Sequence, residues 1–172
     1  TGSHVLALRE TLNYYQPLSN HYAFSSSLGD KALQELSLLY IPAIFYGSQI
    51  YPGTTSLKLY ISGTLVAEAQ DLYRNGELTQ VSGSSFAMAN GGGSSAGVIL
   101  YKEGVLVLTG SWDLSETTFD RGDDTGRFRW IDFAAGANDG TADVSPSASF
   151  TFNFAGQQPI ETITMFADAP KS

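Results

Sequence analysis

Residues Gly97 to Leu114 read GVILYKEGVLVLTGSWDL, and this stretch decides the fold class. Two apolar runs, Val98–Tyr101 and Val105–Thr109, are separated by the short polar break Lys102-Glu103-Gly104. A tight hairpin turn uses such a break, because glycine adopts left-handed backbone angles that other residues resist. Each run is too short for a stable helix and is rich in Val, Ile and Leu. The pattern therefore predicts a β-hairpin, covered on both faces, at the centre of an all-β domain.

The composition fits one domain of this class. The chain has 172 residues, of which 42% are hydrophobic and only 15% are charged, and it contains 18 glycines. A chain of this length buries roughly 70% of its unfolded surface, which is enough for a sizeable core. Few charges and many glycines favour strands and turns over helices.

The charge balance and the residue types that are missing exclude several classes of partner. The net charge is −8, whereas contact with nucleic-acid phosphates needs clustered Lys and Arg, so no nucleic-acid partner is expected. The chain has no cysteine, which excludes a disulfide framework and a thiolate metal site. No apolar stretch approaches the ~18 residues of a membrane-spanning helix, so no membrane insertion is expected.

The amino-terminal third is less regular than the rest. Residues 1–4 spell Thr-Gly-Ser-His, which is typical of a cleaved affinity tag, so we expect the domain to comprise residues 5–172. Val5–Tyr22 is mixed and aromatic, and it predicts an edge strand or an extended arm. Lys31–Leu39 is ambiguous: one interpretation is at most two helical turns leading into a strand, and the other is one long strand over Leu36–Phe45.

From Tyr46 onward, apolar and polar residues alternate in short segments bounded by turn dipeptides, notably Ser62-Gly63 and Asn75-Gly76. Together with the hairpin and the strands expected in the amino-terminal third, they give roughly nine or ten strands, which favours an antiparallel, jelly-roll-like β-sandwich with at most one short helix. These further segments are Ser56–Ile61, Thr64–Gln70, Glu77–Val81, Arg127–Phe133, Ala148–Phe154 and Ile160–Phe166.

Three polar segments between the expected strands are interpreted as loops. Ser82–Ala96 is rich in Gly and Ser, Glu116–Gly126 is polar, and Ala134–Pro146 is small and acidic. A turn at Gln157-Gln158-Pro159 would join the last two strands into a terminal hairpin.

Tests for catalytic motifs give no catalytic residue. Gly93–Gly97 fits the G-x-S-x-G pattern of a hydrolase nucleophile, but that motif needs a preceding strand, a following helix and a later histidine. No histidine follows His21, and we expect a strand after the motif. A glycosidase needs two carboxylates facing each other across a cleft, and no motif places them. The glutamates available for that role are Glu68, Glu77, Glu103, Glu116 and Glu161.

Two acidic clusters, Asp120–Asp124 and Asn138–Asp143, contain oxygen ligands of the kind that calcium prefers. Neither has the spacing of an EF-hand, so the favoured interpretation is a pair of solvated acidic loops, and no metal site is predicted. Arg121-Gly122-Asp123 spells the tripeptide that integrins recognise, which we attribute to coincidence. No cofactor site is predicted either.

Trp112 and Trp130 are the residues best suited to stack on the apolar face of a sugar. Each borders or lies within an apolar strand, which favours packing in the core instead.

Five runs of the sequence together carry a resemblance: Tyr40–Ser48, Ser56–Leu65, Asn75–Leu78, Gly97–Leu114 and Thr162–Lys171. They resemble a group of virion structural proteins from large tailed phages, especially marine and cyanobacterial phages with contractile tails. The resemblance covers the chain from about Thr11 to Lys171.

This resemblance implies a non-enzymatic structural module of a tail, baseplate or fibre, within a longer polypeptide. The implied partners are other virion proteins and further copies of the chain, in a particle assembled in the host cytoplasm. It assigns no role to any single residue. The alternative is a carbohydrate-binding module for a host-surface glycan, with Ser82–Ala96 and Glu116–Pro146 as the binding rim.

Overall fold

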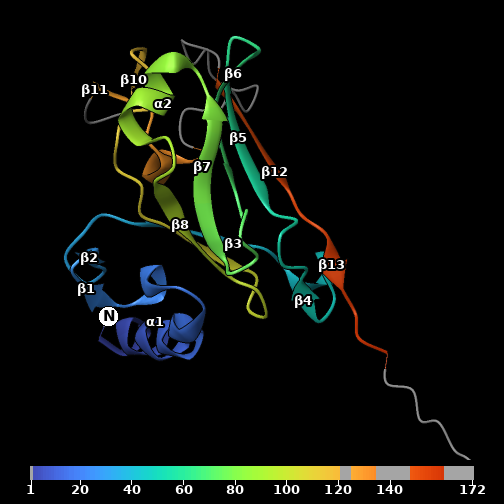
Figure 1. Ribbon diagram of the computed structural model, residues 1–172. Coiled ribbons are helices and arrows are strands. Elements are labelled where there is room, and N and C mark those ends of the chain that lie inside the picture. The colour runs from blue at the N-terminus through green and yellow to red at the C-terminus, as the bar shows by residue number, and fades with distance from the viewer. Residues whose placement is uncertain (1, 121–124, 135–147, 161–172) are drawn as a thin grey trace, which may run out of the picture.

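Within residues 2–120, 125–134 and 148–160, which the computed structural model describes, one seven-stranded antiparallel sheet is accompanied by small two-stranded sheets. Figure 1 shows the large sheet, here called the main sheet, with a helix at its lower end. In spatial order its strands are β12 (Ala148–Asn153), β5 (Ser56–Ile61), β6 (Thr64–Gln70), β7 (Glu77–Gly83), β8 (Ser95–Leu100), β9 (Val105–Leu108) and β3 (Ser37–Tyr40).

Consecutive strands from β5 to β9 are neighbours and form an antiparallel meander. Strands β3 and β12 reach the two edges of the main sheet through long connections. The expected all-β, antiparallel, sandwich-like fold is confirmed, although one twisted sheet, closed by short elements, supplies most of the core.

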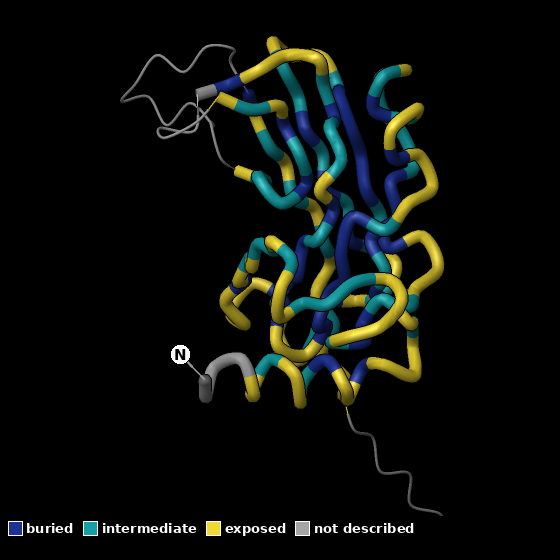
Figure 2. Tube along the Cα trace, turned by 90° about the vertical axis from the view of Figure 1, so that its left-hand side faces the viewer, coloured by how far each residue is buried: buried dark blue, intermediate teal, exposed yellow. Residues whose placement is uncertain are grey.

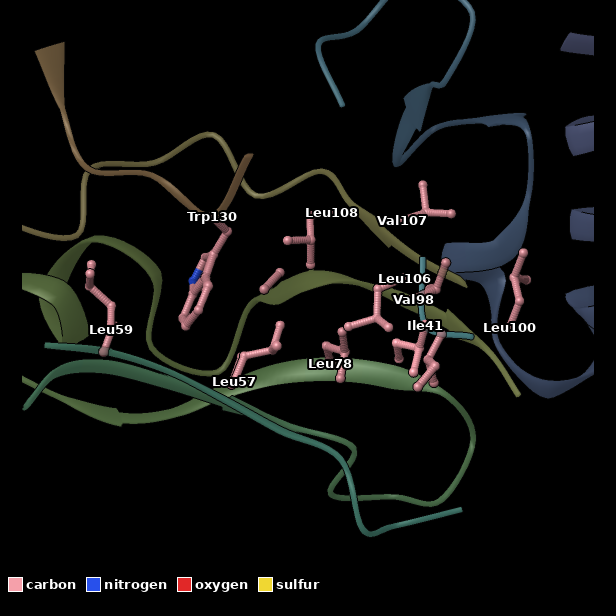
Figure 3. Close-up of a cluster of buried hydrophobic side chains, with 14 of the residues drawn as sticks. Ile41, Leu57, Leu59, Leu78, Val98, Leu100, Leu106, Val107, Leu108 and Trp130 are labelled. Carbon is pink, nitrogen blue, oxygen red and sulfur yellow. The ribbon is translucent and has the colours of Figure 1, made fainter. Parts of the chain in front are cut away.

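The hairpin predicted from Gly97–Leu114 is present as β8 and β9, with Val98 opposite Val107. Gly104, in the turn, has a φ of 64°, which glycine tolerates and most residues do not. Because side chains alternate along a strand, Leu106 and Leu108 point to one face and Val107 to the other, as Figure 3 shows. All three are buried, which confirms that both faces of the hairpin are covered.

Figure 2 shows the buried positions concentrated in the strands of the main sheet and the exposed ones along the helix and the turns. Large apolar side chains from β5, β7, β8 and β9 meet those of the connecting segments. The largest fully buried residues include Trp130, Tyr22, Phe119, Phe128, Leu12, Ile50, Leu57, Leu59, Leu78 and Leu106.

Short elements surround the main sheet. The helical ones are α1 (Gly2–Tyr15), η1 (Gln16–Leu18), η2 (Asn20–Tyr22), η3 (Ala43–Phe45), α2 (Ser85–Gly91) and η4 (Trp130–Asp132). The two-stranded sheets pair β1 (Ser25–Ser26) with β2 (Gly29–Asp30), β4 (Gln49–Ile50) with β13 (Gly156–Gln157), and β10 (Thr118–Asp120) with β11 (Thr125–Arg127). None of the described helices is both long and apolar enough to cross a membrane.

The expectation of a strand or extended arm over Val5–Tyr22 is wrong. Helix α1 occupies this region, and its half-buried Leu8 and buried Leu12 and Tyr15 follow the helical spacing of three to four residues. The helix begins at Gly2, so residues 2–4 are helical. The described residues form two α-helices, α1 and α2, whereas at most one short helix was expected.

The Gly- and Ser-rich segment Ser82–Ala96 is not the expected loop. It contains the end of β7, helix α2 and the start of β8. The Ser84 hydroxyl caps α2 by accepting a hydrogen bond from the Ala87 N–H at 3.1 Å. Helix α2 packs closely against the Trp112 side chain. A Cβ on Gly91 would lie 1.8 Å from the indole nitrogen of Trp112, so only glycine fits at this position.

Three further expectations differ from the structure. Arg127–Phe133 is not a continuous strand, because the chain leaves β11 and forms η4, which places Trp130 in the core. Turns replace the short helix expected after Lys31, although a strand, β3, does follow. Gln157 lies in β13 rather than in a turn, and all but the first residue of Ile160–Phe166 lies outside the described residues.

Candidate functional site

The lower end of the main sheet contains a pocket of about 450 Å³, here called the aromatic pocket. It lies between the end of α1 with η1, the turn after β4, the β6–β7 turn and the end of β8. Its walls are mainly apolar, and two cationic side chains stand among them. Its lining includes Tyr14, Tyr15, Leu18, Pro52, Arg74 and Lys102.

The base of the aromatic pocket is a buried hydrogen-bond network around Asp71. This carboxylate accepts hydrogen bonds from the Gly53 N–H at 2.7 Å, the Gly76 N–H at 3.1 Å and the Tyr101 hydroxyl. Burial, and next the hydrogen bond to Asp71, raise the pKa of the Tyr101 hydroxyl well above its usual range. Tyr101 therefore stays a neutral donor, and the network joins two turns to the end of β8.

One wall of the aromatic pocket is fixed to the β8–β9 turn. The Tyr15 hydroxyl donates to Glu103 Oε2 at 2.7 Å and accepts from the Lys102 N–H at 3.0 Å. Burial, above all, raises the pKa of the Tyr15 hydroxyl. The Lys102 ammonium lies 5.3 Å from the centre of the Tyr14 ring and 3.1 Å from its hydroxyl. These contacts attach the end of α1 to the main sheet.

Arg74 is the second cation of the aromatic pocket. Its φ of 56° lies in the left-handed region, which is strained for a residue with a side chain. None of the ion pairs found among the described residues includes its guanidinium. A pocket with tyrosine and proline walls and two cations suits a ligand with a flat apolar face and a negative group.

A second surface lies at the β3 edge of the main sheet. Four large apolar side chains are exposed there, two on β3 and two on η3, and we call them the edge surface. The segment Leu36–Tyr46, LSLLYIPAIFY, contains no charged residue. The edge surface consists of Leu38, Tyr40, Ile44 and Phe45.

The structure places both tryptophans in packing roles. The indole N–H groups of Trp112 and Trp130 each donate to Gln80 Oε1 at 2.8 Å. Trp130 is fully buried and Trp112 is partly buried. Core packing is therefore confirmed for Trp130, and neither ring lines the aromatic pocket.

The G-x-S-x-G segment lacks the geometry of a nucleophile elbow. Ser95 begins β8, and its hydroxyl donates to the Gly97 carbonyl at 3.2 Å. A strand follows where the motif requires a helix. The contact found for the His21 ring is with Glu77, whose Oε1 lies 3.4 Å from its Nε2.

Glu68 is the most buried of the four candidate glutamates that the structure describes. Burial raises the pKa of its carboxyl group, but hydrogen bonds from Gln70 and Ser56, together with the nearby Lys58 ammonium, outweigh this and lower it overall. Glu68 thus acts as a hydrogen-bonded charge within the sheet. The described residues contain no group of three acidic or histidine side chains that could hold a metal ion.

Several sequence candidates lie outside the described residues. These are Glu161, the tripeptide Arg121-Gly122-Asp123, and the acidic clusters Asp120–Asp124, apart from the first residue, and Asn138–Asp143.

The residues that line the aromatic pocket were not among the candidates that the sequence indicated. Asp71 directly follows β6 and precedes the Asn75-Gly76 turn, where a carboxylate commonly accepts turn N–H groups. That local signal could have indicated its role. Its pairing with Tyr101 joins the residues that directly follow β6 and β8, 30 positions apart in the sequence, so no local pattern indicates it.

Comparison of the chain with family models, with curated proteins and with solved structures gives no match. Functional proposals therefore rest on the sequence resemblance and on the two surfaces.

Proposed function

We propose that the chain is a non-enzymatic structural module of a tailed-phage particle, in a tail, baseplate or fibre, where it binds other virion proteins and further copies of itself. The sequence resemblance supports the class. The observation that carries the proposal is the edge surface: four exposed apolar side chains in an uncharged segment, two of them on the open edge strand β3 and two on η3.

The physical argument is that natural β-proteins protect their sheet edges. They use charged residues, prolines or covering segments, because an open apolar edge pairs with other chains. Strand β3 has none of the charges, and Pro42 follows it rather than interrupting it. Exposed contiguous apolar residues of this kind mark interaction surfaces.

The test has two parts. Sedimentation velocity of the purified chain over a range of concentrations should show association. Mass spectrometry of purified phage particles that encode the chain should detect its peptides in stoichiometric amounts. A chain that stays monomeric at every concentration and is absent from particles contradicts the proposal.

The aromatic pocket favours a second candidate function, a carbohydrate-binding module for a host-surface glycan. Tyrosine rings stack on the apolar faces of sugars, and Arg74 and Lys102 would bind an acidic sugar. A glycan array tests this directly, with Arg74→Ala as the binding-deficient variant and Arg9→Ala, outside the pocket, as its control. An array without signal, with and without calcium, rules it out.

A further inference from the structure

Backbone groups of β3 point alternately toward β9 and away from it. The Ile41 N–H donates to the Gly104 carbonyl at 2.8 Å, so the backbone groups of Ile41 point toward β9. Leu39, two residues earlier and opposite Leu106, points its backbone groups the same way. Hydrogen-bonded and non-hydrogen-bonded pairs alternate in an antiparallel ladder, so Leu38 and Tyr40 direct their N–H and C=O groups away from β9. No described strand pairs with that outer side, which leaves these two residues as open pairing positions.

A second copy of β3 fits this edge in one register. Antiparallel pairing of Leu38 with Tyr40 of the second copy, and of Tyr40 with its Leu38, uses every open group of both strands. Shifting the register by two residues places one of these positions opposite Leu36 or Pro42, outside the strand, and proline has no N–H to donate. The edge of β3 is therefore self-complementary about a two-fold axis at Leu39.

Side chains favour the same arrangement. Leu38 and Tyr40 are 52% and 70% exposed and lie on one face of β3. A two-fold axis perpendicular to the sheet places both copies of this pair on that face, where each leucine lies opposite a tyrosine. Aromatic residues paired with aliphatic ones across strands stabilise antiparallel sheets.

The distribution of charge also favours the edge surface as the contact between two copies. Each copy has a net charge of −8, so two copies repel each other over most of their surfaces. The uncharged segment Leu36–Tyr46 lets copies approach at the smallest electrostatic cost. Salt screens the remaining repulsion, so association should strengthen as ionic strength rises from low to physiological values.

We propose that two copies of this chain pair through β3 about a two-fold axis at Leu39, which joins their main sheets into one continuous sheet. This inference rests on the proposed assembly function and specifies one contact within it.

The first experiment tests the edge with charges. The variant L38K/Y40K places lysine opposite lysine in both pairs, and we expect the dimer dissociation constant to rise about tenfold or more. The matched control L72K/Y73K changes the same residue types on the β6–β7 turn, where Leu72 and Tyr73 are 53% and 65% exposed. The control should dimerise as the original chain does. Equal effects of both variants would contradict the proposal.

A third variant tests the register. L38E/Y40K places glutamate opposite lysine in both pairs of the proposed register, but like charges opposite each other if Leu38 faces Leu38 or Tyr40 faces Tyr40. We expect L38E/Y40K to dimerise more tightly than L38K/Y40K. If it dimerises as weakly, the register is wrong. Circular dichroism of each variant confirms that it folds.

Cysteine cross-linking measures the axis directly, because the chain has no cysteine of its own. Cα atoms of Leu39 in the two copies would lie about 4.5 Å apart, within the range of a disulfide. Those of Ser37 would be separated by roughly 13 Å along the strands. Mild oxidation should therefore cross-link L39C and leave S37C monomeric on a non-reducing gel. Cross-linking of S37C alone overturns the axis.

Failure of this inference can be separated from failure of the proposed function. If L38K/Y40K and the original chain associate equally while peptides of the chain are found in particles, the β3 contact is wrong and the function stands.

Discussion

The two ends of the main sheet contain different buried polar networks. At the upper end, Gln80 is a neutral amide that accepts from the indoles of Trp112 and Trp130 and donates to the Ala87 carbonyl at 2.7 Å. At the lower end, Asp71 is a carboxylate held by Tyr101 and turn N–H groups beside the open aromatic pocket. The difference indicates that the upper end is a closed structural core, whereas the lower end is built around ionisable groups.

The largest loss of stability is expected when the upper network around Gln80 is removed. Gln80→Leu removes the acceptor of two indole N–H groups and the donor to the Ala87 carbonyl, so we expect the free energy of unfolding to fall by about 3–5 kcal/mol. Urea unfolding followed by circular dichroism measures this. Gln16→Leu, on the exposed η1, is the control and should change it by less than about 0.5 kcal/mol. A loss below about 1 kcal/mol for Gln80→Leu would contradict a stabilising role of these hydrogen bonds.

A smaller effect is expected at the lower network. Asp71→Asn keeps the size of the side chain but replaces one acceptor oxygen with an NH2 group that faces existing donors. We expect a loss of about 2–3 kcal/mol, because charged hydrogen bonds are lost and donors oppose each other. A double-mutant cycle with Tyr101→Phe should give a coupling above about 0.5 kcal/mol. Additive losses would mean that Tyr101 and Asp71 do not act together.

The third effect is absent at neutral pH and appears only at alkaline pH. The pKa values of the Tyr15, Tyr22 and Tyr101 hydroxyls are raised in the fold, chiefly by burial, so their ionisation favours the unfolded chain. Their stabilisation is fully present below about pH 10, the pKa of an unperturbed tyrosine, and is lost as the pH rises above it.

Each of these tyrosines should contribute up to about 1.4 kcal/mol of lost stability per pH unit above that point. Unfolding by urea at a series of pH values, with tyrosinate absorbance as a second signal, measures the slope. Tyr101→Phe should reduce the slope, whereas Gln80→Leu should leave it unchanged. Equal slopes in all three proteins would contradict the role of the lower network.

Local signals predicted the strands well. The bounds of β5 and β6 match the expected segments Ser56–Ile61 and Thr64–Gln70, because alternation and the Ser62-Gly63 turn are both encoded within a few residues. The β8–β9 hairpin and β12 are also present, with bounds that differ from the expected ones by at most one residue, except at the start of β8, which lies three residues earlier. These elements need no information from distant parts of the chain.

The remaining elements depend on signals that were masked or distant. The helical spacing of α1 was present, but aromatic residues and Pro17 favoured an extended arm. The Gly- and Ser-rich composition of Ser82–Ala96 favoured a loop, so the helix α2 that Ser84 caps was not predicted. Trp130 lies in η4 rather than in the expected strand, and its indole donates a hydrogen bond to Gln80, 50 residues away in the sequence. Both networks and the aromatic pocket join segments far apart in sequence, which composition and periodicity do not report.

The position of β3 in the chain has a consequence for biosynthesis. Its partner β9 is the last strand of the meander, so strands β5 to β8 all lie between β3 and β9 in the sequence, and a ribosome releases the amino-terminal part first. The uncharged segment Leu36–Tyr46 therefore emerges well before β9 can cover its inner side. Until β9 is synthesised, this segment is an exposed apolar stretch of nascent chain, so co-expression with a chaperone that binds apolar segments should raise the yield of folded protein.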